Sequence, residues 1–143
     1  MSERYDSANI FARILRGEIP SERLYEDEAT VAIMDVMPQS KGHCLVLPKT
    51  LSRNLLDVDD ATLSAVMVVV ARLARAVKSA FSADGVFVCQ FNEAPAGQTV
   101  FHLHVHVIPR YDGVELVRHA GAPVDQAVLA GHAAVIREAL ARS

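Results

Sequence analysis

Three histidines occupy alternate positions in the segment "FHLHVHVIPR" (101–110), with an apolar residue in each gap. Because side chains of a β-strand alternate between the two faces of a sheet, this pattern predicts a strand with His102, His104 and His106 on one face. Same-face Cα atoms lie about 6.6 to 6.8 Å apart, so the rings would form a row about 13 Å long. The opposite face would be apolar and would pack in a core: Phe101, Leu103, Val105 and Val107.

The composition is typical of one globular domain. Of the 143 residues, 51% are hydrophobic and 22% are charged, so residues 1–143 can form a single domain with a sizeable core. The formal net charge of -3 gives no reason to expect a nucleic-acid partner. The longest apolar run, at 65–71, is too short to span a bilayer, and the N-terminus lacks the apolar segment of a signal peptide. We therefore expect a cytoplasmic protein without a membrane partner.

Apolar spacing and turn residues predict an α+β fold. The first helix begins near Ser7 or Asn9 and ends at Gly17, and the long helix begins after Asp59 or Asp60. Consecutive strands joined by short turns favour an antiparallel sheet with helices packed on it. The expected helices are 7–17, 60–81 and about 124–141, and the expected strands are 23–27, 30–35, 43–48, 86–92 and 101–110. The apolar stripe of the long helix comprises Leu63, Val66, Met67, Val70, Leu73, Ala74 and Val77.

Three interpretations of the histidine row are open. It could be the water-facing side of a strand that happens to use histidine. It could be a metal site, since an HxH pair can chelate zinc; a straight strand, however, resists bringing three rings to one ion, and the sequence has no cysteine cluster or HExxH motif. It could also be catalytic, because a neutral imidazole attacks phosphorus well and neighbouring rings can differ in protonation near neutral pH. One ring can then attack while another donates a proton to the leaving group.

Two further segments fit the catalytic interpretation. His43 follows a glycine at the start of an expected strand, and would by itself be a structural residue. Beside a histidine row it becomes a candidate to fix a ring tautomer. The loop before the row supplies neutral donors suited to phosphate oxygens, and its glycine exposes backbone N–H groups. These loop residues are Asn92, Gly97, Gln98 and Thr99.

The segment "HLHVHVI" resembles the signature of the histidine-triad (HIT) superfamily of nucleotide hydrolases and transferases. The resemblance extends over about residues 9–110: "NIFARILRGEIPSERLYEDEATVAIMDVMPQSKGHCLVLPK" is similar to the N-terminal half of the Hint branch, and "AGQTVFHLHVHVIPR" to its catalytic half. It implies a five-stranded antiparallel sheet and a homodimer with a ten-stranded sheet. The dimer interface would form from the helix at 60–81 and the strand at 86–92.

The resemblance also implies a role for each site residue. His104 would be the nucleophile that attacks the α-phosphorus, His106 would contact the phosphate and leaving group, and His102 would form a supporting relay with His43. Asp35 would bind the ribose hydroxyls, while Asn92, Gln98 and Thr99 match phosphate-binding positions. An apolar slot would hold the base and would discriminate weakly between purines: Ile10, Phe11, Ile14, Ile33 and Val36. From spacing alone, the first three of these would be core residues.

The implied activity is hydrolysis of purine nucleoside phosphoramidates to nucleoside monophosphates, without a cofactor or metal. Two alternatives stay open: a dinucleoside polyphosphate hydrolase like the Fhit branch, which shares "GQTV", and a nucleotide- or partner-binding protein with incidental catalysis. Some members have zinc-binding cysteines where this chain has Asn9 and Ala12, so we expect that zinc site to be missing. The chain also lacks the C-terminal tryptophan of eukaryotic Hint proteins. His119 and His132 have no assigned role.

Overall fold

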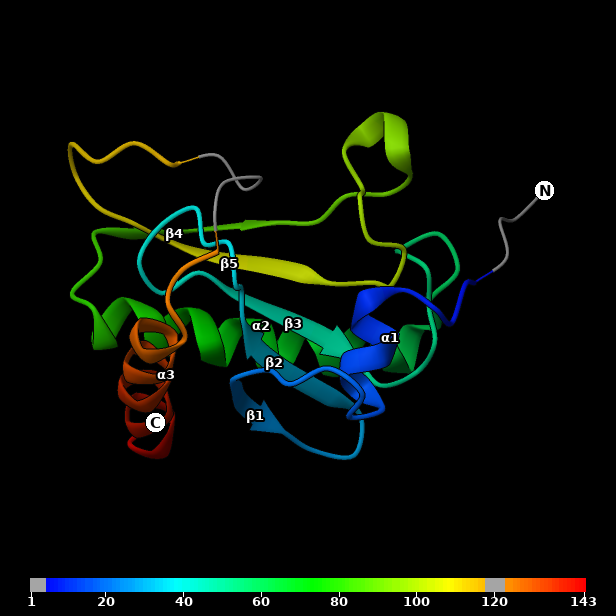
Figure 1. Cartoon of the computed structure of the whole chain (residues 1–143), viewed down its shortest axis with the longest axis horizontal. Coiled ribbons are helices and arrows are strands. Elements are labelled where there is room, and N and C mark those ends of the chain that lie inside the picture. Colours follow the sequence, from blue (N-terminus) through cyan, green and yellow to red (C-terminus); the bar gives the residue numbers. More distant parts are fainter. Residues whose placement is uncertain (1–4, 118–122) are drawn as a thin grey trace.

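The structure is a computed structural model that describes residues 5–117 and 123–143, so His119 lies outside the described residues. The elements follow the predicted order. They are α1 (Ile10–Leu15), β1 (Arg23–Glu26), β2 (Thr30–Met34), β3 (Cys44–Pro48), α2 (Asp60–Ala80), β4 (Gly85–Cys89), a short 3₁₀ turn (Ala94–Ala96), β5 (Val105–Arg110) and α3 (Gln126–Ala141). The strands form one antiparallel sheet in the order β1-β2-β3-β5-β4, which confirms the predicted α+β architecture (Figure 1).

Side-chain caps explain where the helices begin. The side chain of Asn9 accepts a hydrogen bond from the N–H of Ala12 at the start of α1, and Asp59 accepts from Thr62 at the start of α2. Asp125 caps α3 in the same way. Gly17 has a φ of +79°, a conformation that favours glycine, and it ends the first helix as predicted.

The two faces of the sheet pack against different helices. On one face, Val46 of β3 and Val105 and Val107 of β5 lie in a cluster with α2 and α3. On the other face, Leu45 and its neighbours pack against α1. Leu45 pairs directly with His106 in the β3–β5 ladder, so His106 lies on the α1 face. The predicted division of the triad strand into an apolar and a histidine face is therefore correct for β5.

The predicted strand begins too early, because His102 and His104 precede β5. The β3–β5 ladder stops at the pair Val46–Val105, and continuing it would place Leu103 opposite Pro48. Pro48 has no N–H to donate, and the N–H of Leu103 instead donates to the carbonyl oxygen of Ser52 at 2.8 Å. The segment before β5 thus leaves the sheet and binds a loop. All three histidines are nevertheless buried.

The apolar stripe of α2 differs from the predicted one at its edges. Val66, Val70, Leu73 and Val77 are buried as expected, but Met67 is 43% exposed and Val69 is buried. The buried stripe therefore includes Val69 and excludes Met67. Among the described residues, no helix combines the length and the apolar character needed to cross a membrane.

Candidate functional site

A cleft of about 450 Å³ opens on the α1 face of the sheet, within the usual size range of small-molecule sites. All five residues of the predicted base slot line it, and so do Asp35, Gly97, Thr99, His104 and His106. His43, Asn92, Gln98 and His102 are not among its lining residues. Sequence reasoning missed other lining residues, which come from distant segments and have no shared spacing: Ile19, Pro20, Ser21, Met34, Met37, Gln39, Leu45, Phe91 and Val100.

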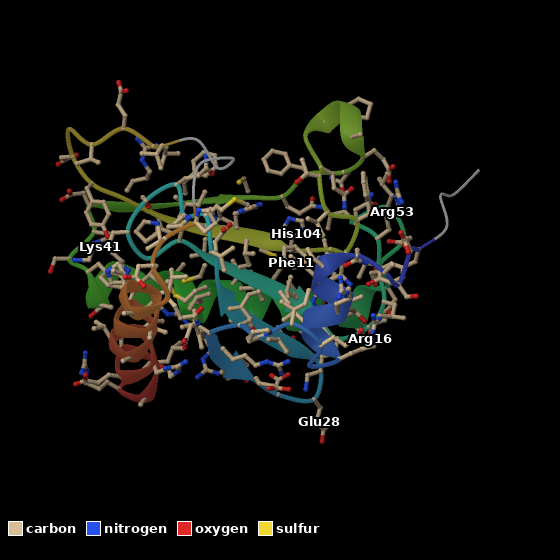
Figure 2. The ribbon with its side chains drawn as sticks, viewed as in Figure 1. Phe11, Arg16, Glu28, Lys41, Arg53 and His104 are labelled. Atoms are coloured by element: carbon tan, nitrogen blue, oxygen red, sulfur yellow. The ribbon has the colours of Figure 1, made fainter. Side chains whose placement is uncertain are left out.

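His104 is held in one tautomer by its own segment. Its Nδ1 lies 2.7 Å from the carbonyl oxygen of His102, and a carbonyl can only accept, so Nδ1 bears the proton. In the neutral ring, Nε2 therefore has the lone pair that a nucleophile needs. Phe11 of α1 packs edge-on against this ring, with centroids 4.7 Å apart (Figure 2).

His106 is held in the opposite tautomer by His43. The N–H of Gln39 donates to Nδ1 of His43 at 3.0 Å, so the proton of the neutral, fully buried His43 ring is on Nε2. That nitrogen lies 2.9 Å from Nδ1 of His106, which must accept. In a neutral His106 ring the proton is consequently on Nε2, where it can be donated. The His104 and His106 ring centroids are 5.1 Å apart, so a lone pair and a proton donor are neighbours.

His102 is supported independently of His43. Its Nε2 donates to the carbonyl oxygen of Pro48 at 2.9 Å, and the hydroxyl of Tyr5 meets its Nδ1. Burial lowers the pKa of His102 from 6.5 to about 4, so this ring is neutral at physiological pH. The two histidines that the resemblance groups into one relay thus have separate partners: His43 contacts the ring of His106, and His102 contacts His104 through its backbone.

Asp35 lies between the cleft and His43. It follows β2 directly and is 3% exposed. Its Oδ1 accepts from the N–H of Met37 at 2.8 Å, and its Oδ2 is 3.4 Å from Nε2 of His43. A carboxylate held in this way lines the cleft and also lies against the histidine that orients His106.

Gln98 fixes the loop before the triad from inside the protein. Its amide donates to the carbonyl oxygens of Arg53 and Val100, at 2.8 and 3.1 Å, and accepts from Asn54 and from the N–H of Glu93. Both amide hydrogens are thus directed at backbone carbonyls. Arg53 also makes two 2.8 Å hydrogen bonds to the Glu93 carboxylate.

Asn92 binds protein partners as well. Its Oδ1 accepts from the N–H of Leu55 and from Gln90, and its Nδ2 donates to Gln90. The loop held in this way brings Gly97 and Thr99 to the cleft. Gly97 has a φ of +108°, and an added Cβ would approach Phe91 to 3.1 Å, so a side chain there would be strained.

Within residues 5–117 and 123–143, one group has potential ligand atoms close enough to suggest a metal: Asp35, His43 and His106, whose ligand atoms all lie within 4.8 Å of one another. The tautomers argue against that use. Nδ1 of His43 accepts a backbone N–H, so a metal on Nε2 would require the ring to lose its only proton. At the two positions where the family resemblance implies zinc-binding cysteines in some members, this chain has Asn9, which caps α1, and Ala12, which is a buried helix residue. These residues do not fit a metal.

The charge of the cleft is also distinctive. No lysine or arginine is among the residues that line it in the described part of the chain, and Asp35 is the carboxylate among them. Apart from Asp35, the polar side chains of the lining are histidines, hydroxyls and one amide. The cleft therefore suits a ligand with an apolar part and a limited number of phosphate charges.

The fold and these contacts define an α+β protein with a buried histidine site, in which a ring lone pair of His104 lies beside a ring N–H of His106. Residues 16–113 match the family model of the HIT domain, and the chain belongs to this family. A Hit-like protein from Bartonella henselae, described as involved in cell-cycle regulation, has a similar crystal structure: the TM-score is 0.89 at 52% identity, over 95% of this chain and 99% of that one.

Two relatives are similar over about three quarters of the chain. The "Protein hit" of Bacillus subtilis is 41% identical over 102 residues, which are 71% of this chain and 70% of that protein. The adenosine 5'-monophosphoramidase HNT1 of Saccharomyces cerevisiae is 39% identical over 107 residues, which are 75% of this chain and 65% of that protein.

Proposed function

We propose that this protein is a purine nucleoside 5'-phosphoramidate hydrolase that acts through a covalent nucleotidyl-His104 intermediate. The observation that supports this best is the pair of opposite tautomers, with a lone pair on Nε2 of His104 and a proton on Nε2 of the neighbouring His106. The named activity of the yeast relative, which is 39% identical, is consistent with it.

The substrate would use the cleft from one end to the other. The base would lie in the apolar slot of Ile10, Phe11, Ile14, Ile33 and Val36, with the ribose hydroxyls at Asp35. The α-phosphate would lie beside His104, where the Gly97 backbone and the Thr99 hydroxyl also line the cleft. Since both amide hydrogens of Gln98 donate to backbone carbonyls, we assign Gln98 to shaping the phosphate loop rather than to contacting phosphate.

In the first chemical step, Nε2 of His104 forms a bond to the α-phosphorus and the P–N bond breaks. The electron pair of that bond goes to the leaving nitrogen, which takes the Nε2 proton of His106 and departs as an amine. The adduct is an imidazolium, because the Nδ1 proton of His104 stays hydrogen-bonded to the His102 carbonyl. The neutral His106 ring has given up its only proton, so it is transiently an imidazolate beside this imidazolium until a proton from solvent restores it. Water then attacks phosphorus, the P–Nε2 bond electrons return to His104, and the proton lost by water returns to solvent. No step requires a cofactor or a metal.

The charge of the cleft favours an amine over a polyphosphate as the leaving group. A departing nucleoside diphosphate or triphosphate has several negative charges, which protein sites neutralise with arginine, lysine or a metal ion. No arginine or lysine lines this cleft in the described structure. An uncharged amine requires only a proton, which His106 can supply. The dinucleoside polyphosphate hydrolase is therefore the second candidate rather than the first.

We also propose that the protein forms a homodimer through β4 and α2. β4 is at the edge of the sheet, where its outer N–H and C=O groups have no neighbouring strand in the described chain (Figure 1). Exposed apolar side chains lie on both elements: Phe87 and Val88 on β4, and Met67 and Val68 on α2. Pairing two β4 strands would extend the sheet to ten strands and cover these side chains.

The test compares adenosine 5'-phosphoramidate with diadenosine triphosphate as substrates, for the wild type and for His104→Ala. We expect the phosphoramidate to have the higher kcat/KM, and His104→Ala to lose at least about a thousandfold of the activity. Faster cleavage of the triphosphate would favour the second candidate. Tight AMP binding without turnover of either compound would instead favour a nucleotide- or partner-binding protein. Activity that survives in His104→Ala would reject the covalent mechanism.

A further inference from the structure

Tyr5 makes a long-range contact with the triad that the mechanism above does not use. Its hydroxyl oxygen lies 2.5 Å from Nδ1 of His102, 97 residues away in sequence. The two rings pack edge-on, with centroids 5.6 Å apart. His102 is completely buried, so water does not replace Tyr5 at this nitrogen without rearrangement of the surrounding side chains.

The direction of this hydrogen bond follows from the other bond of the ring. Nε2 of His102 lies 2.9 Å from the carbonyl oxygen of Pro48, and therefore bears the proton. In the neutral ring, Nδ1 is then an acceptor, and the Tyr5 hydroxyl is the group that donates to it. Tyr5 and Pro48 thus hold the two nitrogens of His102 from opposite sides.

His102 in turn sets the geometry of the nucleophile. Its backbone carbonyl accepts the Nδ1 proton of His104, and this bond keeps the lone pair on Nε2. The side chain of His102 is the anchor of a segment that has already left the sheet, so ladder hydrogen bonds do not hold it. The Leu103 N–H of the same peptide group donates to Ser52 at 2.8 Å, and the contacts of the His102 ring with Pro48 and Tyr5 hold the other side of this carbonyl.

The N-terminal segment is itself attached to the helix of the cleft. The side chain of Arg16 donates to the carbonyl oxygen of Ser7 at 2.8 Å. The N–H of Ala8 donates to the carboxylate of Asp6, and the side-chain amide of Asn9 donates to the Asp6 carbonyl oxygen. This turn leads directly into α1, whose residues line the apolar slot. Tyr5 therefore contacts His102, close to His104, and is separated by only a few residues from the helix that lines the slot.

We propose that Tyr5 is a positioning residue that acts through His102 to hold His104 in its nucleophilic geometry. The catalytic part of this inference rests on the proposed function, since it assumes that His104 attacks. Tyr5 does not line the cleft, so it is expected to affect the rate of the chemical step and not the binding of substrate. Phenylalanine at this position keeps the ring contact and removes only the hydroxyl.

The kinetic test compares Tyr5→Phe with Tyr25→Phe. The Tyr25 hydroxyl donates to Asp27 in an exposed bond on the protein surface, so Tyr25→Phe is a control for losing a tyrosine hydroxyl elsewhere. We expect Tyr5→Phe to lower kcat for adenosine phosphoramidate between about threefold and tenfold, the value of one hydrogen bond, with KM within about twofold. Tyr25→Phe should leave both constants unchanged. An unchanged kcat in Tyr5→Phe would overturn the proposal.

A double-mutant comparison tests whether the effect passes through His102. In a His102→Gln background, adding Tyr5→Phe should have no further effect on kcat, because its target is missing. Two independent, multiplicative losses would show that Tyr5 acts in another way. Unfolding curves of all variants keep a general loss of stability distinct from a kinetic effect.

Nitrogen NMR of the imidazole rings tests the contact without relying on activity. In Tyr5→Phe, the Nδ1 signal of His102 should move toward that of a lone pair without a donor, and the Nδ1 proton of His104 should exchange faster with water. Both signals should be unchanged in Tyr25→Phe. If the wild type hydrolyses no phosphoramidate, the proposed function fails while these spectra still decide the role of Tyr5. If neither signal changes, Tyr5 does not position the triad.

Discussion

His104 and His106 lie two residues apart, yet different kinds of partner hold their rings. The Nδ1 proton of His104 is donated to the carbonyl oxygen of His102, within the same short segment. The Nδ1 of His106 accepts from His43, 63 residues earlier, and the N–H of Gln39 orients His43 in turn. A local bond therefore places the lone pair of one ring, whereas contacts between distant segments place the proton of the other.

This difference separates the two functions that the proposed mechanism requires. Substitutions between Asp35 and His43 would disturb the hydrogen bonds that keep the proton of His106 on Nε2. The hydrogen bond that keeps the lone pair of His104 on Nε2 would be unaffected, because His102 accepts it. Changes around His102 do the reverse. Nucleophilic attack and proton donation should consequently respond to different substitutions and to different leaving groups.

The largest effect expected from this comparison concerns His106→Ala. With a phosphoramidate as substrate, we expect kcat/KM to fall by about a hundredfold or more, because the leaving amine must be protonated. With the p-nitrophenyl ester of AMP, whose leaving phenolate requires no proton, the loss should be less than about tenfold. Release of nucleoside monophosphate from the two substrates measures both values.

His132→Ala is the matched control for this experiment. His132 lies on α3 beside Phe81, away from the cleft, so its loss should change neither substrate's kcat/KM by more than about twofold. Equal losses for both substrates in His106→Ala would mean that this residue supports attack or phosphate binding. The division of roles between the two rings would then be wrong.

The same contrast explains which parts of the site were predictable from the sequence. The caps at Asn9 and Asp59 and the alternation of Val105 and Val107 are local patterns, and local patterns determine helix ends and strand faces directly. The assignment of a base slot came from the family resemblance, and it stays a prediction. From spacing alone, Phe11 and its helix neighbours would have been core residues, and Phe11 is indeed buried while it also lines the cleft.

The parts that were not predictable depend on distant partners. The strand was expected to include His102 and His104, but Pro48 and Ser52, which belong to other segments, end the ladder earlier. The tautomer of His43 depends on a backbone N–H, which no residue type reveals. Such contacts are visible only after the chain has folded.

A second prediction concerns His102, whose carbonyl oxygen accepts the Nδ1 proton of His104, and the stability of the protein at low pH. Burial lowers the pKa of His102 to about 4 in the folded protein, whereas the unfolded chain has the ordinary value of 6.5. The unfolded state therefore binds more protons between these values, and the folded state loses stability as the pH falls from about 6.5 toward 4. We expect this histidine to account for a loss of about 3 kcal/mol in the free energy of unfolding.

Urea unfolding at pH 7.5 and at pH 4.5 measures this effect. Burial, with a contribution from Lys41, also lowers the pKa of His132, so His132 adds a loss of the same sign. The comparison of wild type with His102→Gln isolates the contribution of His102, since the variant should lose less stability between the two pH values. An equal pH dependence in both proteins would show that His102 is not held neutral by the fold.

The smallest expected effect concerns the proposed base slot. The affinity of this slot for a base should not depend on the tautomers of His104 and His106. Its five predicted residues are all apolar, so adenine and guanine should bind with affinities within about fivefold, the value of one hydrogen bond. Ile10 is 45% exposed, and Ile10→Ala should therefore weaken AMP and GMP binding by the same small factor without unfolding the protein. Calorimetric titration of the two nucleotides measures this. A strong preference for one purine would require a polar contact to the base edge, for which Ser21 and Gln39 are the side chains of the cleft that could be changed next.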